Sequence, residues 1–162
     1  MTRRNAEKFN LSKATNILKQ INSKIGGDLF YMKFPEAMND MRTMLIGIDV
    51  CHAGPQSIVG FAASTNKEMS QYHSEYLVQK KGQEIVGAGM KEGLKMAIDV
   101  FKRENGAMPT DFIIYRDGVG DAQRDQVLKK EVSQFKAAIS ELYDPSQDQP
   151  KITLVVVNKR IN

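Results

Sequence analysis

Residues 112–121 read Phe-Ile-Ile-Tyr-Arg-Asp-Gly-Val-Gly-Asp. This stretch is typical of a buried strand that carries a carboxylate, Asp117, at its end and then breaks at a glycine turn. Residues 44–50, Met-Leu-Ile-Gly-Ile-Asp-Val, have the same character, with Asp49 near the end. A charge beside a buried strand is costly unless it is paired or bound to a metal. Two such strands therefore indicate two carboxylates brought together for a cation.

The segments around these two strands predict an α/β fold with a five-stranded mixed sheet and flanking helices. The predicted elements are, in order, a helix capped by Ser12 and stopped at Gly26-Gly27, strands 43–50, 57–63 and 71–79, a helix after Gly82 that ends at Asn105, strand 111–115, a long helix from about Ala122 to Asp144, and strand 152–157. The apolar stripe expected on the last helix is Leu128, Val132, Phe135, Ile139 and Leu142.

The connections predict how these strands pair. Short links make the first three strands antiparallel, and crossover helices make the last two parallel to a neighbour. This is the element order of the ribonuclease H fold, in which the first and fourth strands are adjacent and parallel. Asp49 and Asp117 are therefore expected side by side at one edge of the sheet, where open α/β sheets bind ligands.

Composition bounds the class of protein. The 162 residues are enough for one domain with a real core, and a hydrophobic content of 41% with 26% charged residues is ordinary for a globular protein. No apolar run approaches the ~20 residues of a membrane span, and no secretory signal follows Met1. A single cysteine, Cys51, excludes an internal disulfide and a cysteine-rich zinc site. We therefore expect no membrane partner and a reducing location, the cytoplasm or the nucleus.

Positive charge gathers at the N-terminus. The chain has a net charge of +4, and residues 1–24 carry six basic side chains and one acidic side chain. A basic leader on a near-neutral body favours a polyanionic partner such as nucleic acid. The alternative is a solvated tail. We predict a basic leader over residues 1–13 and a folded domain over residues 14–162.

Six short motifs occupy residues 22–29 (NSKIGGDL), 47–52 (GIDVCH), 57–64 (SIVGFAAS), 82–84 (GQE), 115–121 (YRDGVGD) and 159–162 (KRIN). Together they resemble one family, the PIWI domain of Argonaute proteins, and its Piwi branch in particular. Each motif is weak alone, but six in this order and spacing make a specific signal. The resemblance covers nearly the whole chain, from about Ala14 to Asn162.

The resemblance implies a partial PIWI domain that binds a small guide RNA and a complementary target RNA. In cutting members, Mg²⁺ (or Mn²⁺) ions held by hard oxygen ligands cleave the target RNA. Matched by motif, Asp49 and Asp117 are the two catalytic, metal-binding aspartates, and Glu84 is the catalytic glutamate that swings in from a loop. The fourth ligand of the family lies downstream of residues 159–162, so we expect the domain to be incomplete at its C-terminus and this chain alone to be inactive.

The resemblance also implies a site for the 5′ phosphate of the guide. Lys24 matches a phosphate-binding lysine, and Gln20 matches a glutamine that the Piwi branch favours one helical turn upstream. These positions are i and i+4 on one helix face. The rest of that pocket belongs to an upstream domain of the family. The alternative for Lys24 is an ordinary basic residue in a last helical turn, which suits the helix dipole.

Each catalytic assignment also has a plainer interpretation. Asp49 could be a polar residue at a strand end, satisfied by backbone donors. Asp117 could cap the glycine turn or pair with Arg116. Glu84 could be an acid that the helix dipole favours near a helix start. His52, three residues after Asp49, is interpreted as structural.

Two other functions compete with a guided RNA endonuclease. One is a guide-binding or scaffold module that does not cut. The other is a nucleotide-dependent α/β enzyme, because residues 118–120 form a glycine turn between a strand and a helix. That enzyme needs a third glycine at position 123, which is Gln123 here, so the pattern disfavours it.

Overall fold

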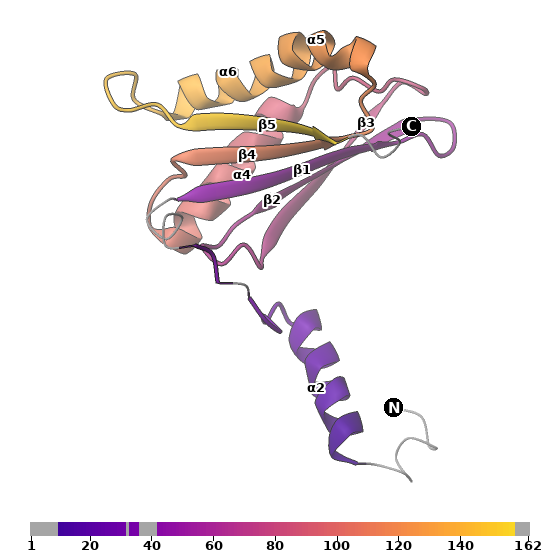
Figure 1. The fold of residues 1–162 in the computed structure, drawn as a ribbon, viewed down its shortest axis with the longest axis vertical. Helices are drawn as coiled ribbons and strands as arrows, with labels where there is room; N and C mark the ends of the chain where they lie inside the picture. The colour runs from indigo at the N-terminus through magenta and orange to yellow at the C-terminus, as the bar shows by residue number, and fades with distance from the viewer. Residues whose placement is uncertain (1–9, 32, 36–41, 158–162) are drawn as a thin grey trace. The chain divides into compact units, whose positions relative to one another are not determined.

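The chain divides into two compact units, residues 1–33 and 34–162. The computed structural model describes residues 10–31, 33–35 and 42–157. The first unit contains the helix α2 (Leu11–Lys24), and the second contains the other described helices and all the described strands (Figure 1). Over the described ranges, every helix is too short or too polar to cross a bilayer.

The second unit alternates strands and helices in the predicted order. Its elements are β1 (Thr43–Cys51), β2 (Ser57–Ser64), β3 (Tyr72–Gln79), α4 (Met90–Asn105), β4 (Asp111–Asp117), η1 (Asp121–Gln123), α5 (Arg124–Gln126), η2 (Val127–Glu131), α6 (Val132–Leu142) and β5 (Lys151–Val157). The strand β4 runs two residues beyond its predicted end, so that Asp117 is its last residue.

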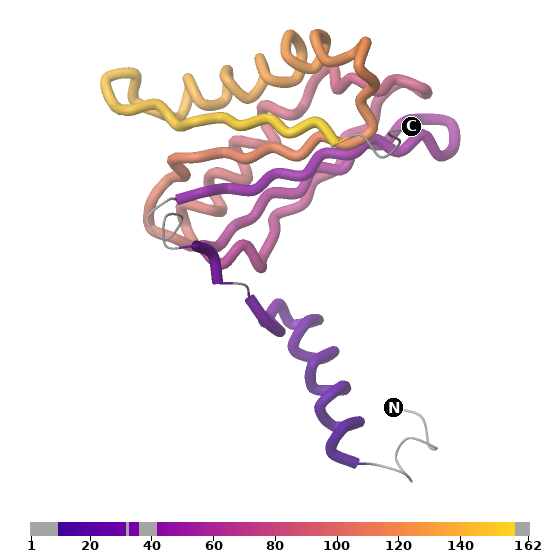
Figure 2. Tube along the Cα trace, in the orientation of Figure 1, coloured from indigo at the N-terminus to yellow at the C-terminus, as the bar shows by residue number. Residues whose placement is uncertain are grey.

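The five strands form one mixed sheet in the order β3-β2-β1-β4-β5, which can be followed along the chain in Figure 2. The pairs β1–β2 and β2–β3 are antiparallel, and the pairs β1–β4 and β4–β5 are parallel. The predicted fold class is confirmed, including the parallel contact between the first and the fourth strand.

One face of the sheet packs against α4 and α6. Alternate residues of the strands point into this core, as the period of two requires. The core contains Met44, Ile46, Ile48, Val59, Phe61, Phe112 and Ile114 from the sheet, and Leu94, Ile98, Phe101, Phe135 and Ile139 from the helices. Figure 1 shows α4 lying across the sheet on this side. The core fixes which side chains of β1 and β4 point to the opposite face.

The opposite face of the sheet is also rich in apolar side chains, but these are exposed. They are Ile58, Tyr72, Tyr76, Val78 and Tyr115. On β3 the exposed residues, which include Tyr72, Tyr76 and Val78, alternate with half-buried ones. Asp49 lies on this face of β1, between the exposed Gly47 and Cys51.

The start of α2 differs from the prediction. Ser12 was expected to cap the helix, but the cap is Asn10, whose side-chain Oδ1 accepts a hydrogen bond from the Lys13 N–H at 3.0 Å. Asn and Ser are both strong N-cap residues, so the sequence alone favours neither.

The predicted long helix after β4 is interrupted. It begins as η1 and α5, widens into the π-helical segment η2, and only then continues as α6. The predicted stripe is wrong at both ends. Leu128 is 55% exposed and Val127 is buried instead, and Leu142 is 36% exposed. A π segment adds one residue to a turn and rotates the preceding positions around the helix axis. The physical reason for this change of face is Glu131, which the segment directs into the core.

Candidate functional site

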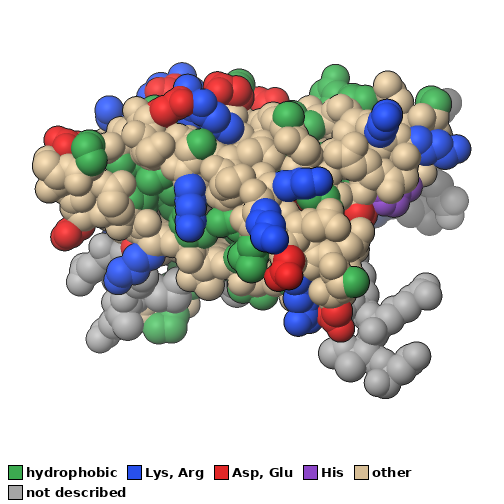
Figure 3. Space-filling model, turned by 90° about the horizontal axis from the view of Figure 1, so that it is seen from above, with side chains coloured by type: hydrophobic (Ala, Val, Ile, Leu, Met, Phe, Trp, Pro, Cys, Tyr) green, Lys and Arg blue, Asp and Glu red, His purple; other side chains and the backbone are tan. Residues whose placement is uncertain are grey.

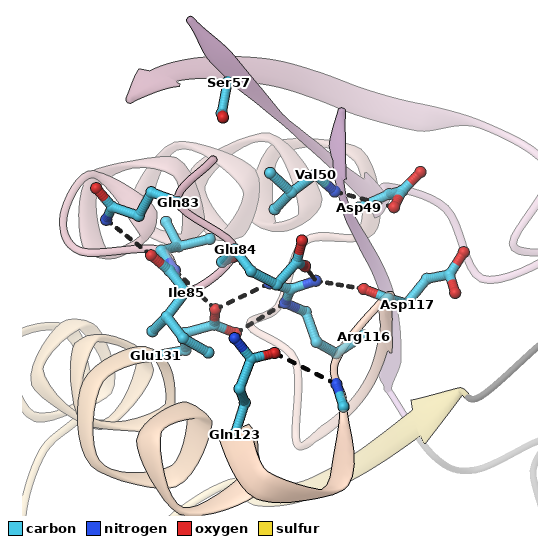
Figure 4. Close-up of polar contacts among 12 residues, drawn as sticks. Asp49, Val50, Ser57, Gln83, Glu84, Ile85, Arg116, Asp117, Gln123 and Glu131 are labelled. Carbon is cyan, nitrogen blue, oxygen red and sulfur yellow. Dashed lines mark hydrogen bonds and ion pairs between the residues drawn. The ribbon is translucent and has the colours of Figure 1, made fainter. Parts of the chain in front are cut away.

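Asp49 and Asp117 lie on neighbouring strands at the same edge of the sheet. The strands β1 and β4 are parallel, and Ile48 of one pairs with Arg116 of the other. Each aspartate is the next residue along its strand. Both point to the sheet face opposite the helices, and Figure 4 shows their carboxylates directed to the same side. The predicted juxtaposition of these two side chains is therefore present.

Asp49 is exposed, and one of its carboxylate oxygens is partly satisfied within the chain. Its Oδ1 accepts a hydrogen bond from the Val50 N–H at 2.9 Å. This is the backbone donor that the plainer interpretation of Asp49 requires. Oδ2 has no hydrogen bond from a described residue, so Asp49 offers an outward-facing anionic oxygen next to the strand that carries Asp117.

Glu84 lies in the segment between β3 and α4, and two side chains hold its carboxylate. Its Oε1 forms an ion pair with Nη1 of Arg116 at 2.9 Å, and its Oε2 lies 3.0 Å from Nε2 of His52. The glutamate was expected to be mobile, swinging in from a loop. In this structure its side chain is only 14% exposed and is engaged on the side of Arg116 (Figure 4).

Arg116 is the centre of this network, and its side chain is wholly buried. Its guanidinium also contacts Glu131, with Nε 3.0 Å from Oε2 and Nη2 3.2 Å from Oε1. Further hydrogen bonds go to the backbone carbonyls of Asp117 and Glu84. Burial by itself lowers the pKa of Arg116, but the hydrogen bonds and charges of Glu131 and Glu84 outweigh it, so the pKa is raised and the cation is stabilised.

His52 joins the network to β2. Its Nδ1 lies 2.8 Å from Oγ of the buried Ser57, and that hydroxyl accepts a hydrogen bond from the Gly82 N–H at 2.9 Å. The structural role predicted for His52 agrees with these contacts. The imidazole is a link between the end of β1 and the segment that carries Glu84.

The segment between β3 and α4 has little regular structure, yet polar contacts fix it along its length. The backbone of Val86 is held on both sides, since its N–H donates to Glu131 Oε1 at 2.8 Å and its carbonyl accepts from Gln134 Nε2 at 3.0 Å. Gln134 Oε1 also accepts from the Met90 N–H at 3.1 Å. These side-chain hydrogen bonds satisfy backbone groups that have no partner in a helix or sheet. They also fix the position of the segment that carries Glu84.

The three predicted catalytic carboxylates do not form a closed metal centre. Within the described ranges, no three His, Cys, Asp or Glu side chains converge in a way that could hold a metal ion. Asp49 and Asp117 are brought to one edge, while Glu84 is engaged by Arg116 and His52. The assignment of all three as catalytic residues stays a prediction.

The predicted phosphate-binding residues belong to the first unit. Gln20 and Lys24 lie one helical turn apart in α2, and Lys24 is its last residue and its only basic residue in the last turn. This is the arrangement that both the phosphate site and the ordinary helix-dipole interpretation require. The motif at residues 159–162 and the first nine residues of the leader lie outside the described residues.

Sequence reasoning missed the residues that hold Glu84. Arg116 was considered only as a partner for Asp117, and neither Glu131 nor Ser57 was singled out. A signal was present, because Arg116 lies on the same face of a buried strand as Phe112 and Ile114, and a buried cation requires a buried anion. The glutamate that supplies it is 15 residues away, and the π segment that turns it inward has no simple sequence pattern.

Comparisons with known proteins agree with this architecture. The model of the Piwi domain family matches residues 1–162. Piwi-like protein 1 of Gallus gallus is 37% identical over 155 residues, which are 94% of this chain and 17% of that protein. The crystal structure of the N. crassa QDE-2 AGO MID-PIWI domains superimposes with a TM-score of 0.76 at 28% identity, covering 92% of this chain and 44% of that one.

A further solved structure has the same fold at lower identity. The Kluyveromyces polysporus Argonaute with a guide RNA gives a TM-score of 0.76 at 22% identity, over 94% of this chain and 18% of that one. The present chain thus spans about a sixth of its full-length relatives. With a family model that matches it from end to end and a sheet that superimposes on Argonaute structures, this chain belongs to the Piwi domain family.

Proposed function

We propose that this chain is the part of a small-RNA-guided endonuclease that supplies the carboxylates for cutting target RNA. The observation that carries the proposal is the placement of Asp49 and Asp117 on adjacent parallel strands, directly after the paired residues Ile48 and Arg116. Carboxylates on neighbouring strands at one sheet edge provide the oxygen ligands that a divalent cation takes. Membership of the Piwi domain family supports an RNA target.

The two aspartates suit a magnesium ion. Mg²⁺ is usually bound through one or two carboxylates together with waters and substrate phosphates, rather than by a closed cage of protein ligands. Asp49 has one carboxylate oxygen occupied by the Val50 N–H and a second oxygen available. A divalent ion bound there supplies an activated water and stabilises the leaving oxygen of a phosphodiester. Asp49 and Asp117 would hold it.

Glu84 is proposed as the third catalytic carboxylate, and Arg116 and His52 as the residues that position it. The Glu84 carboxylate contacts Arg116 through Oε1 and His52 through Oε2, so it can serve at the site only in the arrangement that these two partners permit. Arg116 also donates to the backbone carbonyls of Glu84 and Asp117, so one side chain links both segments of the proposed site.

We propose that Lys24 and Gln20 bind the 5′ phosphate of a small guide RNA. Support comes from their spacing on α2 and from the guide RNA held by the Kluyveromyces polysporus Argonaute, whose fold this chain shares. Lys24 lies in the last turn of α2, and a lysine ammonium group binds phosphate as a point charge.

Metal titration of the whole chain tests the catalytic proposal. Calorimetry with MnCl₂ or MgCl₂ should detect weak binding that Asp49→Asn and Asp117→Asn each abolish. Asp111→Asn is the matched control. Asp111 is the first residue of β4, the strand that ends at Asp117, and its Oδ2 accepts a hydrogen bond from the Thr110 hydroxyl. Equal binding by all four proteins would show that the metal does not use this edge.

Cleavage is tested by placing the chain within a full-length Piwi-like relative. Guided cutting of a matched RNA should disappear with Asp49→Asn or Asp117→Asn while guide binding persists. Undiminished cutting by either variant would place the catalytic centre elsewhere.

A non-cutting guide-binding module is the second candidate. It is favoured by the contacts of Glu84, which faces Arg116 and His52, and by the lack of three converging ligands among the described residues. This function predicts guide binding in the full-length relative with no metal-dependent cleavage by the parent sequence.

A further inference from the structure

A tight turn presents two lysines at the same end of the sheet as Asp49 and Asp117. Lys80 and Lys81 follow β3 directly, and both are exposed. The strands β3 and β1 are each antiparallel to β2, so they run in the same direction and end at the same edge. Figure 1 shows the end of β3 on the same side of the sheet as the ends of β1 and β4.

The pairing register places this turn within reach of a strand that crosses the two aspartates. Gly60 of β2 pairs with Asp49 on one side and with Tyr76 on the other. Lys80 is therefore two strands away from Asp49 and four residues further along. With ~4.8 Å between strands and ~3.3 Å per residue, the backbones of Lys80 and Asp49 are roughly 16 Å apart. A single nucleic-acid strand can span that distance with a few nucleotides.

The turn is held in place before any ligand arrives. The Gln83 N–H donates to the Lys80 carbonyl at 3.1 Å, and Gln79 Nε2 donates to the Gln83 carbonyl at 2.7 Å. The Gly82 N–H is bound by Ser57 Oγ, and Gly82 has a φ of +74°, a conformation that glycine adopts without strain. Because the backbone of the turn is already ordered, a ligand that binds here need order only the side chains of Lys80 and Lys81, which lowers the entropy cost of binding.

These lysines have no anionic partner among the described residues, although other basic side chains do. Lys95 contacts Glu92 and Glu141, and Arg103 contacts Asp99. Figure 3 shows the same mixture on the side of the molecule seen from above, with Lys and Arg interspersed among Asp and Glu. The turn after β3 instead presents two adjacent, exposed positive charges.

The two lysines, Lys80 and Lys81, can offset the negative charge of the proposed catalytic edge. A phosphate that approaches the exposed carboxylate of Asp49 meets a negative charge, which repels it in the absence of a divalent cation. A fixed positive pair on the same edge offsets that repulsion and raises the local concentration of a polyanion.

We propose that Lys80 and Lys81 bind backbone phosphates of the RNA strand that lies across the Asp49–Asp117 edge. The location of that strand rests on the function proposed above. An ammonium group binds phosphate as a point charge and without reading the base, so this contact fixes the position of the RNA independently of its sequence.

Fluorescence anisotropy with the whole chain and a labelled single-stranded RNA lacking a 5′ phosphate tests this proposal, in EDTA and across a salt series. For the double variant Lys80→Ala with Lys81→Ala, we expect the slope of log affinity against log salt to fall by about 1.4, as for the loss of two single-strand phosphate contacts. Replacing both lysines with arginine should preserve the slope.

The matched control is Lys102→Ala with Arg103→Ala. It removes the same charge from the last turn of α4, where both side chains are also exposed. An equal loss of slope in this control would show that only the net charge matters and would overturn the proposal. No change in the Lys80 and Lys81 variant would overturn it as well.

A second measurement tests whether the RNA reaches the two aspartates. In EDTA, Asp49→Asn should tighten binding by the parent chain, because it removes one repulsive charge. In the Lys80→Ala, Lys81→Ala double variant, Asp49→Asn should no longer increase the affinity for RNA. A gain of equal size in both backgrounds would show that the lysines do not hold the RNA at this edge. Both measurements are made in EDTA and need neither bound metal nor cleavage. Failure of the metal-binding or cleavage tests would therefore leave RNA binding by Lys80 and Lys81 intact, and failure of the RNA-binding tests would leave the catalytic proposal intact.

Discussion

Arg116 and Glu131 form a buried ion pair between a strand and a π-helical segment, with Nε and Oε2 3.0 Å apart and both side chains at most 2% exposed. The glutamate also accepts the Val86 N–H through Oε1. One carboxylate thus neutralises the cation in the core and anchors the segment that carries Glu84. The stability of the domain and the geometry of the candidate site therefore depend on the same contact.

Glu131→Gln should destabilise the chain strongly. It keeps the shape of the side chain but removes one of the two carboxylates that form ion pairs with Arg116 in the described part of the chain. Breaking a buried pair from one side typically costs about 3–5 kcal/mol. Urea denaturation followed by circular dichroism measures the loss. Glu141→Gln is the control, because Glu141 makes its ion pairs with Lys91 and Lys95 at the surface. A similar loss in both variants would contradict the role given to the buried pair.

The π segment predicts that substitutions at two adjacent residues, Val127 and Leu128, change the free energy of unfolding by very different amounts. Val127→Ala should lower the free energy of unfolding by about 2 kcal/mol, since it removes buried methyl groups from a side chain with no exposed surface. Leu128→Ala should change it little, because Leu128 is exposed. Thermal unfolding of the two variants checks the order. A larger effect at Leu128 would mean that the segment is a regular helix with the predicted stripe.

The phenol of Tyr143 provides a pH-dependent prediction. Burial raises its pKa well above the ordinary value of 10.0, and the charge of Arg42 offsets only part of this. Because the folded pKa is the higher one, Tyr143 contributes stability that is fully present below pH ~10 and is lost as the pH rises further. Its hydroxyl donates to the Pro109 carbonyl at 2.8 Å.

Tyr143→Phe should therefore destabilise the chain by about 1 kcal/mol at pH 7, the net value of one hydrogen bond. The difference from the parent should shrink above pH 10, where the parent loses the contribution of the phenol. Urea unfolding at pH 7 and pH 10.5 measures both values. Tyr76→Phe, at an exposed position, should show no such convergence, and a constant difference for Tyr143→Phe would contradict the assigned shift.

The open face of the sheet predicts self-association of the isolated chain. Tyr76 is 72% exposed and Tyr115 is 46% exposed, with further apolar residues around them. Large exposed apolar patches favour association. Sedimentation velocity at increasing concentration should show oligomers that Tyr76→Glu with Tyr115→Glu reduces. Leu128→Glu, which removes an exposed leucine elsewhere, is the control. A parent chain that stays monomeric at all concentrations would contradict the prediction.

The elements that the sequence predicts well are those in which local pattern and tertiary environment agree. The apolar run before Asp49 and the alternation on β3 each have one physical interpretation, and chain order then forces the parallel contact between β1 and β4. That contact alone brings Asp49 and Asp117 to the same edge. The juxtaposition was therefore predictable from two short stretches of sequence.

The environment of Glu84 was not predictable in the same way. It depends on Arg116 pointing into the core and on Glu131 being turned toward it by the π segment, and both are long-range effects without a local pattern. The helix cap was missed for a different reason, because Asn10 and Ser12 are nearly equivalent caps and only the fold of the first turn decides between them.

The π segment at residues 127–131 also has a consequence for comparing sequences within the family. A π segment arises when one residue is inserted into a regular helix. A relative with an unbroken helix here should therefore align with this chain only across a one-residue gap, and its position equivalent to Glu131 would rotate out of the core. In such a relative an arginine at the position of Arg116 would keep the partner equivalent to Glu84 but lose the one equivalent to Glu131.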